Sequence, residues 1–487
     1  MENNYNESRN EEWRVELRGS TSPKERVAIK RVEMPQLDPA YRITCNEEVN
    51  QGISEAQAVR EATRCLDCNN PQCVTGCPVG INIPKFIKNI ERRHFAEAAA
   101  TLKETSSLPA VCGRVCPQEK QCESKCIHRK MKQPAVAIGY LERFAADWQR
   151  NHGAEEAVGA PPANGIKVAV VGSGPSGLTF AGDMAKRGFE VTVFEALHEI
   201  GGVLKYGIPE FRLPNAVVDH EIDGLRKMGV NFQKDVLVGR TITYTDLHAM
   251  GFKGIFVGSG AGFPRFMNIP GENLNGVMSS NEYLTRINLM QAGRGGDTPV
   301  ATGRTVAVVG GGNTAMDSSR TALRMGAKRV ILVYRRSEAE MPARIEEIAH
   351  AKEEGVELMT LHNPIEYVGD DKGHVCAMHV QRMELGEPDA SGRRAPIPVE
   401  GAVEEIPVDV VIVAVGVSPN ALVPSSIEGL DVSKRGTIVV NEKSMQSNIS
   451  DLYAGGDIVR GGATVILAMG DGRKAAKNMA ETLLTQK

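Results

Sequence analysis

The chain lacks the features that mark a membrane or secreted protein. No apolar run among its 487 residues approaches the roughly eighteen residues that a membrane-spanning helix needs. The N-terminal residues, MENNYNESRNEEW, do not have the basic and then apolar layout of a secretion signal. We therefore expect a cytoplasmic protein that does not insert into a membrane.

Net charge is also small, and aromatic residues are scarce. The formal charge of −3 gives no reason to expect nucleic acid as a partner. Aromatic residues make up only 5% of the chain, whereas its 50 glycines indicate many tight turns. Because a single hydrophobic core rarely grows beyond about 250–300 residues, a chain of 487 residues predicts roughly two to four domains.

Cysteine is almost absent from the later part of the chain. Of the ten cysteines, all but Cys376 fall within the first 126 residues. A reducing compartment keeps them as thiols unless they bind a metal, so a metal site is favoured over a disulfide framework. Cys45 and Cys376 stand apart from the others and are expected to be ordinary thiols.

The clustered cysteines form two compact runs. The first has the spacing C-x2-C-x4-C-x3-C-P and contains Cys65, Cys68, Cys73 and Cys77. The second has the spacing C-x3-C-P-x4-C-x3-C and contains Cys112, Cys116, Cys122 and Cys126. Structural zinc sites usually pair two C-x2-C units across a longer loop, whereas compact runs closed by Cys-Pro are typical of iron-sulfur ferredoxins. Because the cysteine before proline in a ferredoxin commonly ligates the other cluster, the spacing leaves open which cysteines share a cluster.

The sequence divides into a cysteine-rich block, a linker and a repeated pattern. Residues 1–150 combine the cysteines with segments of helical apolar spacing, such as IPKFIKNIERRHFAEAAATLKET. Residues 151–165, NHGAEEAVGAPPANG, predict a linker because they are rich in Gly, Pro and Ala. From residue 166 the pattern becomes strand, glycine turn, helix and strand, and it recurs from about residue 305. This repeat predicts an α/β protein with two dinucleotide sites.

The first glycine-rich turn follows the apolar strand VAVV and opens a helix. Its glycines permit a tight turn and the close approach of a pyrophosphate to the helix N-terminus. The residues of this turn that we expect to contact the nucleotide are Gly172, Gly174, Pro175, Ser176 and Gly177.

Two carboxylates help to identify the nucleotide at this turn. Glu195 ends the next strand, VTVFE, where it would bind ribose hydroxyls and repel a 2′-phosphate. That position excludes NADP and favours FAD or NAD. Near the C-terminus, LYAGGDIVRGGATVILAMGDGRKAA places Asp457 after a strand and a glycine pair, which suits the longer FAD.

The second glycine-rich turn is a variant of the fingerprint. It contains Gly311, Gly312, Asn313 and Thr314 and follows a second VAVV strand. Where the first unit has an acidic residue at the end of the next strand, this unit has the pair Arg335 and Arg336. Because guanidinium groups bind a 2′-phosphate well, we predict a preference for NADPH. In isolation such a pair, beside Glu338 and Glu340, would more often be a solvated basic surface, but its position at the second strand of a fingerprint favours the nucleotide.

Taken in order, these motifs resemble a known family over nearly the whole chain. The cysteine block, GSGPSG, GGGNTAMD and the AGGD segment are similar to the small (β) subunit of NADPH-dependent glutamate synthase. The same module resembles the N-terminal half of dihydropyrimidine dehydrogenase and the large subunit of electron-bifurcating NADH-dependent ferredoxin:NADP⁺ oxidoreductase. The resemblance implies a helical iron-sulfur domain at residues 1–150. It also implies an FAD domain at 166–285 and 406–487, interrupted by an NADPH domain at 286–405.

The resemblance also implies ligands and cofactor contacts. One 4Fe-4S cluster would be held by Cys65, Cys68, Cys73 and Cys126. The other would be held by Cys77, Cys116, Cys122 and the Glu142 of Ile138-Gly-Tyr-Leu-Glu142, which leaves Cys112 as a spare thiol. Without the family, Glu142 would be taken as a surface glutamate paired with Arg143 or Lys132. Further positions implied to contact flavin are Gly202, Val203, Arg212, Val238, Asp457 and Thr464.

The implied chemistry is electron transfer without a protein nucleophile. NADPH would pass a hydride to FAD, and single electrons would then pass through two 4Fe-4S clusters to a partner. For this reason no acid or base residue is nominated. The expected partner is the large glutamate synthase subunit, which would make glutamate from glutamine and 2-oxoglutarate. The alternative is the bifurcating enzyme, whose partners would be a small flavoprotein and a ferredoxin.

Overall fold

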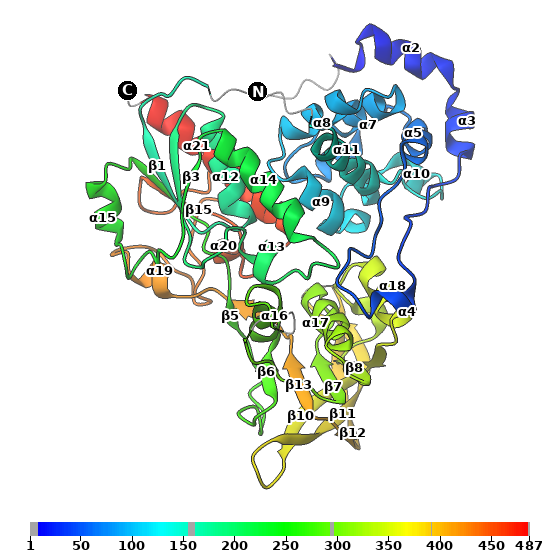
Figure 1. Ribbon diagram of the computed structural model, residues 1–487, viewed down its shortest axis with the longest axis vertical. Coiled ribbons are helices and arrows are strands. Elements are labelled where there is room, and N and C mark those ends of the chain that lie inside the picture. Colours follow the sequence, from blue (N-terminus) through cyan, green and yellow to red (C-terminus); the bar gives the residue numbers. More distant parts are fainter. Residues whose placement is uncertain (1–7, 154–160, 293–296, 391, 486–487) are drawn as a thin grey trace.

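The N-terminal domain is built of helices and is called the helical domain below (Figure 1). The computed structural model describes residues 8–153, 161–292, 297–390 and 392–485. Part of the expected linker, residues 154–160, lies outside the described residues. The elements of this domain are α2 (Glu12–Ser20), α3 (Pro23–Ala28), α4 (Pro39–Arg42), α5 (Glu55–Thr63), α6 (Gln72–Thr75), α7 (Ile83–Glu91), α8 (Phe95–Lys103), α9 (Pro109–Val115), η1 (Gln118–Lys120), η2 (Glu123–Lys125), α10 (Ile127–Lys130) and α11 (Ile138–His152).

Local signals explain where these helices begin and how they pack. Both α3 and α5 start at a serine whose side chain accepts from the third helical residue, in a complete capping box. Helix α7 buries Phe86, Ile87 and Ile90, which repeat at helical spacing. The short helices α6 and α9 contain Cys73 and Cys112, Glu142 lies on α11, and the other clustered cysteines lie in the loops between helices.

The first sheet domain contains five parallel strands in the order β15-β4-β1-β2-β3. The strands are β1 (Lys167–Val171), β2 (Glu190–Phe194), β3 (Asn231–Gln233), β4 (Gly254–Val257) and β15 (Leu452–Ala454). The helices are α12 (Pro175–Ala185), α13 (Val203–Tyr206), α14 (Asn215–Lys227), α15 (Tyr244–Ala249), α19 (Leu422–Ser425), α20 (Asp457–Arg460) and α21 (Val465–Thr485). The strand β15 pairs with β4 although almost 200 residues separate them, so the chain returns to this sheet near its C-terminus.

The second sheet domain repeats this plan, with five parallel strands in the order β6-β13-β7-β8-β9. The strands are β6 (Val277–Ser279), β7 (Thr305–Val309), β8 (Arg329–Tyr334), β9 (Glu357–Thr360) and β13 (Val410–Val413). The helices are α16 (Ser280–Asn288), α17 (Asn313–Arg324), η3 (Glu338–Glu340) and α18 (Ile345–Glu353). This sheet extends beyond the expected range 286–405 on both sides, because β6 and β13 pair with each other.

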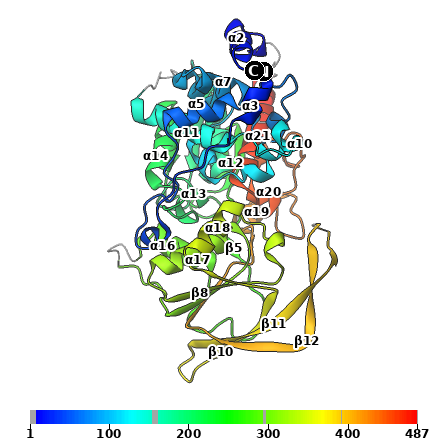
Figure 2. The same ribbon diagram turned by 90° about the vertical axis from the view of Figure 1, so that its right-hand side faces the viewer.

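A third sheet was not expected from the sequence. It is antiparallel, in the order β10-β11-β12, and projects from the second sheet domain (Figure 2). Its strands are β10 (His362–Gly369), β11 (Val375–Pro388) and β12 (Arg394–Pro407). A two-stranded pair, β5 (Phe263–Pro264) with β14 (Val417–Ser418), lies where the chain leaves the first sheet domain and returns to it.

The three domains are joined in two different ways. One continuous hydrophobic core runs through the helical domain and the first sheet domain, from Val32 to Ala480. The second sheet domain has separate cores on the two faces of its sheet. The N-terminal segment contacts the second sheet domain, because its helix α4 lies beside α18 (Figure 1). The first two domains are therefore joined by apolar packing, whereas charged contacts join α4 and α18.

Candidate functional site

The first glycine-rich turn lies between β1 and α12 and opens on a cavity. Gly172 has φ of +97°, a conformation that strains residues with a side chain. Helix α12 begins after Gly174 without a side-chain cap, so its first N–H groups are available to a phosphate. A Cβ at Gly174 would meet nothing within 4 Å, and the buried Ser176 Oγ has no hydrogen-bond partner among the described residues. The turn therefore fits the phosphate cradle that the sequence predicts.

Glu195 is held in place at the end of β2. Its carboxylate accepts from the Ser173 N–H over 2.9 Å, from the Ser173 hydroxyl over 2.5 Å and from the Leu197 N–H over 2.9 Å. The side chain is buried and also lines the cavity. Because each carboxylate oxygen can accept more than one hydrogen bond, Glu195 keeps capacity for ribose hydroxyls. Ser173 therefore orients Glu195, a role that no sequence motif indicates.

The cavity has a volume of about 510 Å³ and brings together most of the expected nucleotide-binding residues. From the first sheet domain it is lined by Gly172, Gly174, Pro175, Ser176, Glu195, Gly202, Val203, Arg212, Val238, Asp457 and Thr464. From the second it is lined by Asn313 and Thr314, so one continuous space adjoins both fingerprints. The helical domain contributes Val115 and Pro117, on either side of Cys116. Burial raises the pKa of Asp457 in this cavity to about 6.

Several expected residues lie outside the lining of this cavity. Gly177 packs α12 against the turn, because a Cβ there would lie 2.1 Å from the Gly172 carbonyl oxygen. Gly311 and Gly312 form the second turn, and α17 starts after Gly312 without a side-chain cap. Both helix starts therefore offer uncapped N–H groups for phosphate.

Arg335 and Arg336 differ in their surroundings. Arg335 is exposed. Arg336 is buried, pairs with Asp389 and donates from Nε to the Arg394 carbonyl over 2.8 Å. Arg335 is thus the more accessible of the two to a bound 2′-phosphate, while Arg336 also ties β8 to the tip of the antiparallel sheet.

The site includes residues that the sequence analysis did not identify. Asp317 lies four residues after Asn313 on α17, faces the same cavity and binds Arg212 through both carboxylate oxygens, at 2.7 and 2.6 Å. The Nε atom of Arg212 also lies 3.2 Å from Oε1 of Glu347 on α18. The helical i, i+4 spacing from Asn313 was the available signal for Asp317. Tyr206, which also lines the cavity, had no such signal.

Four cysteines from the two runs converge on one side of the helical domain. Burial raises the pKa of Cys73, and the neighbouring Cys65, Cys126 and Cys68 raise it further. The same four side chains line a separate cavity of about 100 Å³. Cys65, Cys68 and Cys73 are only half-buried, so this group lies near the surface. We call these four residues the first cysteine set; they are the set that the resemblance implies.

Three other cysteines converge with Glu142; Cys116 and Cys122 are buried, whereas Cys77 is half-buried. Burial raises the pKa of Cys77 to about 12, with Glu142 and Cys116 adding to the effect. Cys122 is likewise surrounded by Cys77, Glu142 and Cys116. We call Cys77, Cys116, Cys122 and Glu142 the second cysteine set. Cys112 also lies here, next to Cys116, so the structure offers two candidates for the fourth ligand.

Glu142 has the surroundings of a ligand rather than of a surface residue. Its side chain is buried, and its Oε1 atom has no hydrogen-bond partner among the described residues. Burial, followed by the charge of Glu221, raises its pKa to about 8. Neither Arg143 nor Lys132 pairs with it among the ion pairs of the described residues, since Arg143 binds Glu48 and Asp147. An unpartnered buried carboxylate beside three thiols fits a cluster ligand.

Neither cysteine set is a single-ion site. Within the described parts of the chain, no three His, Cys, Asp or Glu side chains are arranged to hold one metal ion. A tetrahedral zinc site requires thiolates about 2.3 Å from a common point.

Helix α21 connects the large cavity with the second cysteine set. Its first turn follows Thr464, whose hydroxyl accepts from the Gln121 side chain over 3.5 Å. Further along, the Cys112 thiol lies 3.4 Å from the Met469 sulfur, and Gly470 packs against Pro78. The second cysteine set therefore adjoins the cavity, whereas the first set is nearer the surface.

Comparison with known proteins agrees with this arrangement. Residues 42–154 match the family model described as dihydropyrimidine dehydrogenase domain II, 4Fe-4S cluster, and residues 166–472 match pyridine nucleotide-disulphide oxidoreductase. The chain is 36% identical to the glutamate synthase (NADPH) small chain of Escherichia coli strain K12, over 94% of this chain and 98% of the relative. The chain belongs to the glutamate synthase small-chain family. The expected enzyme class, an NADPH-dependent oxidoreductase, is confirmed by this membership.

A second family member and a solved structure are also similar to this chain. The family member from Azospirillum brasilense, also a glutamate synthase (NADPH) small chain, is 35% identical over 89% of this chain and 90% of its own. The structure of FprA from Mycobacterium tuberculosis in complex with NADPH has a TM-score of 0.55, at 21% identity, over 67% of this chain and 85% of that one. At that identity it supports the fold alone, and it confirms the expected α/β class. Every helix in the described ranges is too short or too polar to cross a bilayer.

Proposed function

We propose that this chain is the electron-input subunit of a glutamate synthase. In this role it takes electrons from NADPH and delivers them, through FAD and two 4Fe-4S clusters, to a large subunit that makes glutamate from glutamine and 2-oxoglutarate. The observation that carries the proposal is the single cavity lined by both fingerprints and by the two residues that flank Cys116. When bound, a flavin accepts a hydride from NADPH and releases electrons singly to iron-sulfur clusters.

In this proposal the first sheet domain binds FAD and the second sheet domain binds NADPH. The turn at Gly172 and the uncapped start of α12 would hold the FAD pyrophosphate, and Glu195 would bind its ribose. The start of α17 would hold the NADPH pyrophosphate, with Arg335 binding the 2′-phosphate. Arg212 would link the two sites, because its Nη1 atom donates to both carboxylate oxygens of Asp317 on α17.

The positions of the two cysteine sets support an order for the clusters. The second set lies next to the cavity and would hold the cluster that receives electrons from it. The half-buried first set would hold the cluster that delivers them to the partner. No side chain in the cavity is assigned as an acid or base, because the proposed chemistry requires only orientation and exclusion of water.

The test uses the purified holoprotein with and without a partner. With NADPH alone, the chain should reduce an artificial dye and form no glutamate from glutamine and 2-oxoglutarate. Addition of a glutamate synthase large subunit should produce NADPH-dependent glutamate. Glutamate formation by the chain alone would contradict the proposal. NADPH-dependent reduction of ferredoxin with a small flavoprotein, without a response to the large subunit, would favour the bifurcating alternative.

A further inference from the structure

The loop of residues 341–344, between η3 and α18, contacts both the second fingerprint and the helical domain. On the fingerprint side, the Ala343 N–H donates to the Gly311 carbonyl over 3.2 Å. The Arg344 N–H donates to Oδ1 of Asn313 over 2.9 Å. Both contacts use the loop's backbone, so they do not depend on the identity of its side chains.

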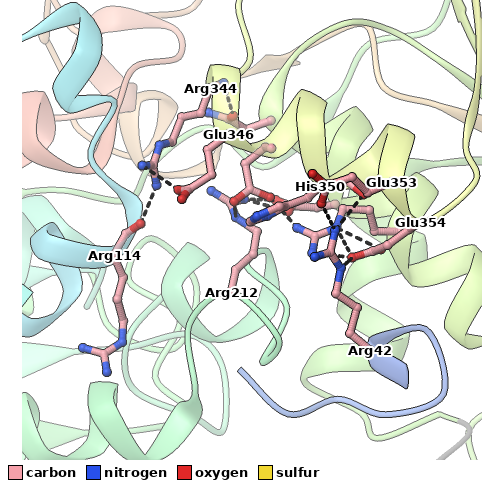
Figure 3. A network of polar contacts seen from close by, with 12 residues as sticks. Arg42, Arg114, Arg212, Arg344, Glu346, His350, Glu353 and Glu354 are labelled. Atoms are coloured by element: carbon pink, nitrogen blue, oxygen red, sulfur yellow. Dashed lines mark hydrogen bonds and ion pairs between the residues drawn. The ribbon is translucent and has the colours of Figure 1, made fainter. Parts of the chain in front are cut away.

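On the other side, the same loop holds the segment that follows Cys112. The Arg344 guanidinium donates to the Arg114 carbonyl over 2.5 Å (Figure 3). It also donates to Oε1 of Gln118 over 3.0 Å. Lys120 donates back to the carbonyls of Pro342 and Ala343, at 2.9 and 3.0 Å. The Arg344 side chain is almost fully buried, at 6% exposed. The loop and the cysteine segment are thus tied by several contacts in both directions.

Gln118 carries these contacts to the backbone of the second cysteine set. Its Nε2 donates to the Cys112 carbonyl over 3.2 Å, and its own N–H donates to the Cys116 carbonyl over 2.9 Å. The Gln118 side chain also packs against Gly139, three residues before Glu142, so closely that a Cβ there would lie 2.4 Å from Nε2. A displacement of Gln118 would therefore reach both Cys116 and the helix that bears Glu142.

Arg344 adds a buried positive charge to this contact. Its acidic neighbours are Glu346, at 3.0 Å, and the more distant Glu119, at 3.9 Å. Net charge and hydrogen bonding around an iron-sulfur cluster set its reduction potential. A positive charge favours the reduced form, because reduction adds an electron to the cluster. Loss of the Arg344 charge should therefore lower the potential of the adjacent cluster.

We propose that Arg344 is a positioning residue that couples the occupancy of the second nucleotide site to the second cysteine set. A phosphate held at the start of α17 would be close to Asn313, the first residue of that helix, whose Oδ1 accepts from the Arg344 N–H. A shift of Asn313 on phosphate binding would move the Arg344 backbone, and the Arg344 guanidinium would pass that movement to Arg114 and Gln118. Nucleotide binding would thereby alter the environment of the cluster that receives electrons. The inference rests on the proposed function in one respect, that NADPH binds the second fingerprint and a cluster binds the second set.

The Arg344→Met variant separates this role from nucleotide binding. It keeps the backbone bond to Asn313 and loses the side-chain bonds to Arg114 and Gln118. Arg344→Lys keeps the charge but cannot reproduce the forked contact, and it serves as a second variant if the methionine variant fails to fold. Lys352→Met is the matched control, because Lys352 lies on α18 and forms an exposed ion pair with Glu338.

The measurement is an EPR-monitored redox titration of each holoprotein, with and without saturating NADP⁺. In the parent and the Lys352→Met control, NADP⁺ should shift the signal or potential of one cluster. In both Arg344 variants that shift should be lost while the affinity for NADP⁺ stays within about twofold. Hydrogen exchange at residues 112–120 should slow on NADP⁺ binding in the parent and in the Lys352→Met control, but not in the Arg344 variants.

Two results would overturn the inference. One is a parent protein in which NADP⁺ binds without changing either cluster or the exchange at residues 112–120. The other is an Arg344→Met protein that responds to NADP⁺ as the parent does. Failure of the proposed function looks different, since NADPH would then neither bind nor reduce the flavin of the parent protein.

Discussion

The Nε atom of Arg42 donates to Oε1 of Glu354 over 2.7 Å, although 312 residues separate the two in the chain (Figure 3). Both side chains are buried. Arg320 and Arg324 bind the same carboxylate, at 2.7 and 2.8 Å, and both stack over Phe211 of the first sheet domain. This one carboxylate therefore connects the N-terminal segment and the second sheet domain at the place where the first sheet domain meets them.

Replacing Glu354 with glutamine should destabilise the second sheet domain. Three buried guanidinium groups would lose their shared counter-charge, which typically costs about 3–5 kcal/mol. Hydrogen exchange at α17 and α18 should accelerate accordingly. The control is Glu357→Gln, because Glu357 pairs with Arg329 on the surface and such a pair contributes at most about 1 kcal/mol. Equal effects of the two substitutions would contradict the importance of the buried network.

The Glu354 carboxylate should also make the stability of the protein depend on pH. Burial alone would raise the pKa of Glu354, but the bonds and charges of Arg320 and Arg324 outweigh it and lower that pKa to about 2. Because the ordinary value is 4.5, the contribution to stability is complete above pH 4.5 and is lost as pH falls towards about 2. Urea denaturation of the parent between these pH values should show this loss. The Glu354→Gln variant should lack that component.

Glu142→Ala should perturb one cluster while leaving the other intact. The buried Oε1 atom has no partner among the described residues, and the second cysteine set has no other carboxylate among its assigned members. Low-temperature EPR and iron content report the effect. Cys112→Ser is the paired variant, because Cys112 is the other candidate ligand, and it should retain both clusters. Loss of a cluster in Cys112→Ser with unchanged spectra in Glu142→Ala would reverse the assignment.

Gly472→Ala should weaken flavin binding by separating α12 from α21. A Cβ at Gly472 would lie 2.2 Å from the Ser176 carbonyl oxygen, so the helix that starts at the first fingerprint would have to move. The flavin content of the purified protein and its release on dilution measure the result. In the control Gly224→Ala, the added Cβ on α14 meets nothing within 4 Å and should stabilise the helix by about 0.5–1 kcal/mol. Full flavin retention in Gly472→Ala would show that the contact is dispensable.

Arg335→Gln should raise the KM for NADPH far more than the KM for NADH. Arg335 is exposed at the end of β8, where it can bind a 2′-phosphate that NADH lacks. Arg336→Gln should additionally reduce stability, because Arg336 is buried against Asp389 and the Arg394 carbonyl. An equal effect of Arg335→Gln on both nucleotides would remove the assignment.

Much of the α/β architecture follows from short-range patterns in the sequence. The two VAVV strands, each with a glycine turn and a helix, predict both parallel sheets because the strand and helix periodicities are local. The boundary of the second sheet domain was set too narrowly. The strand at residues 410–413 pairs with β6 and β7, and strand order cannot be read from the hydrophobic pattern of one strand. The antiparallel sheet of residues 362–407 was missed for a related reason, since it belongs to neither βαβ repeat.

In the candidate site too, residues placed by local patterns could be predicted, whereas residues placed by long-range contacts could not. Glu195 follows from its position at a strand end, and the structure places it in the cavity. Arg344 follows from no motif, because its contacts with Arg114 and Gln118 join residues more than 200 positions apart. Arg212 was expected to contact flavin, and its ion pair with Asp317 appears only once the two sheet domains are placed together.

The most direct test of the account is anaerobic addition of NADPH to the reconstituted holoprotein, followed by visible absorbance and low-temperature EPR. We predict that NADPH bleaches the flavin and produces the signal of at least one reduced 4Fe-4S cluster, with iron content sufficient for two. NADH at the same concentration should act more weakly. A protein whose flavin is reduced by dithionite but remains oxidised with excess NADPH would contradict the central claim.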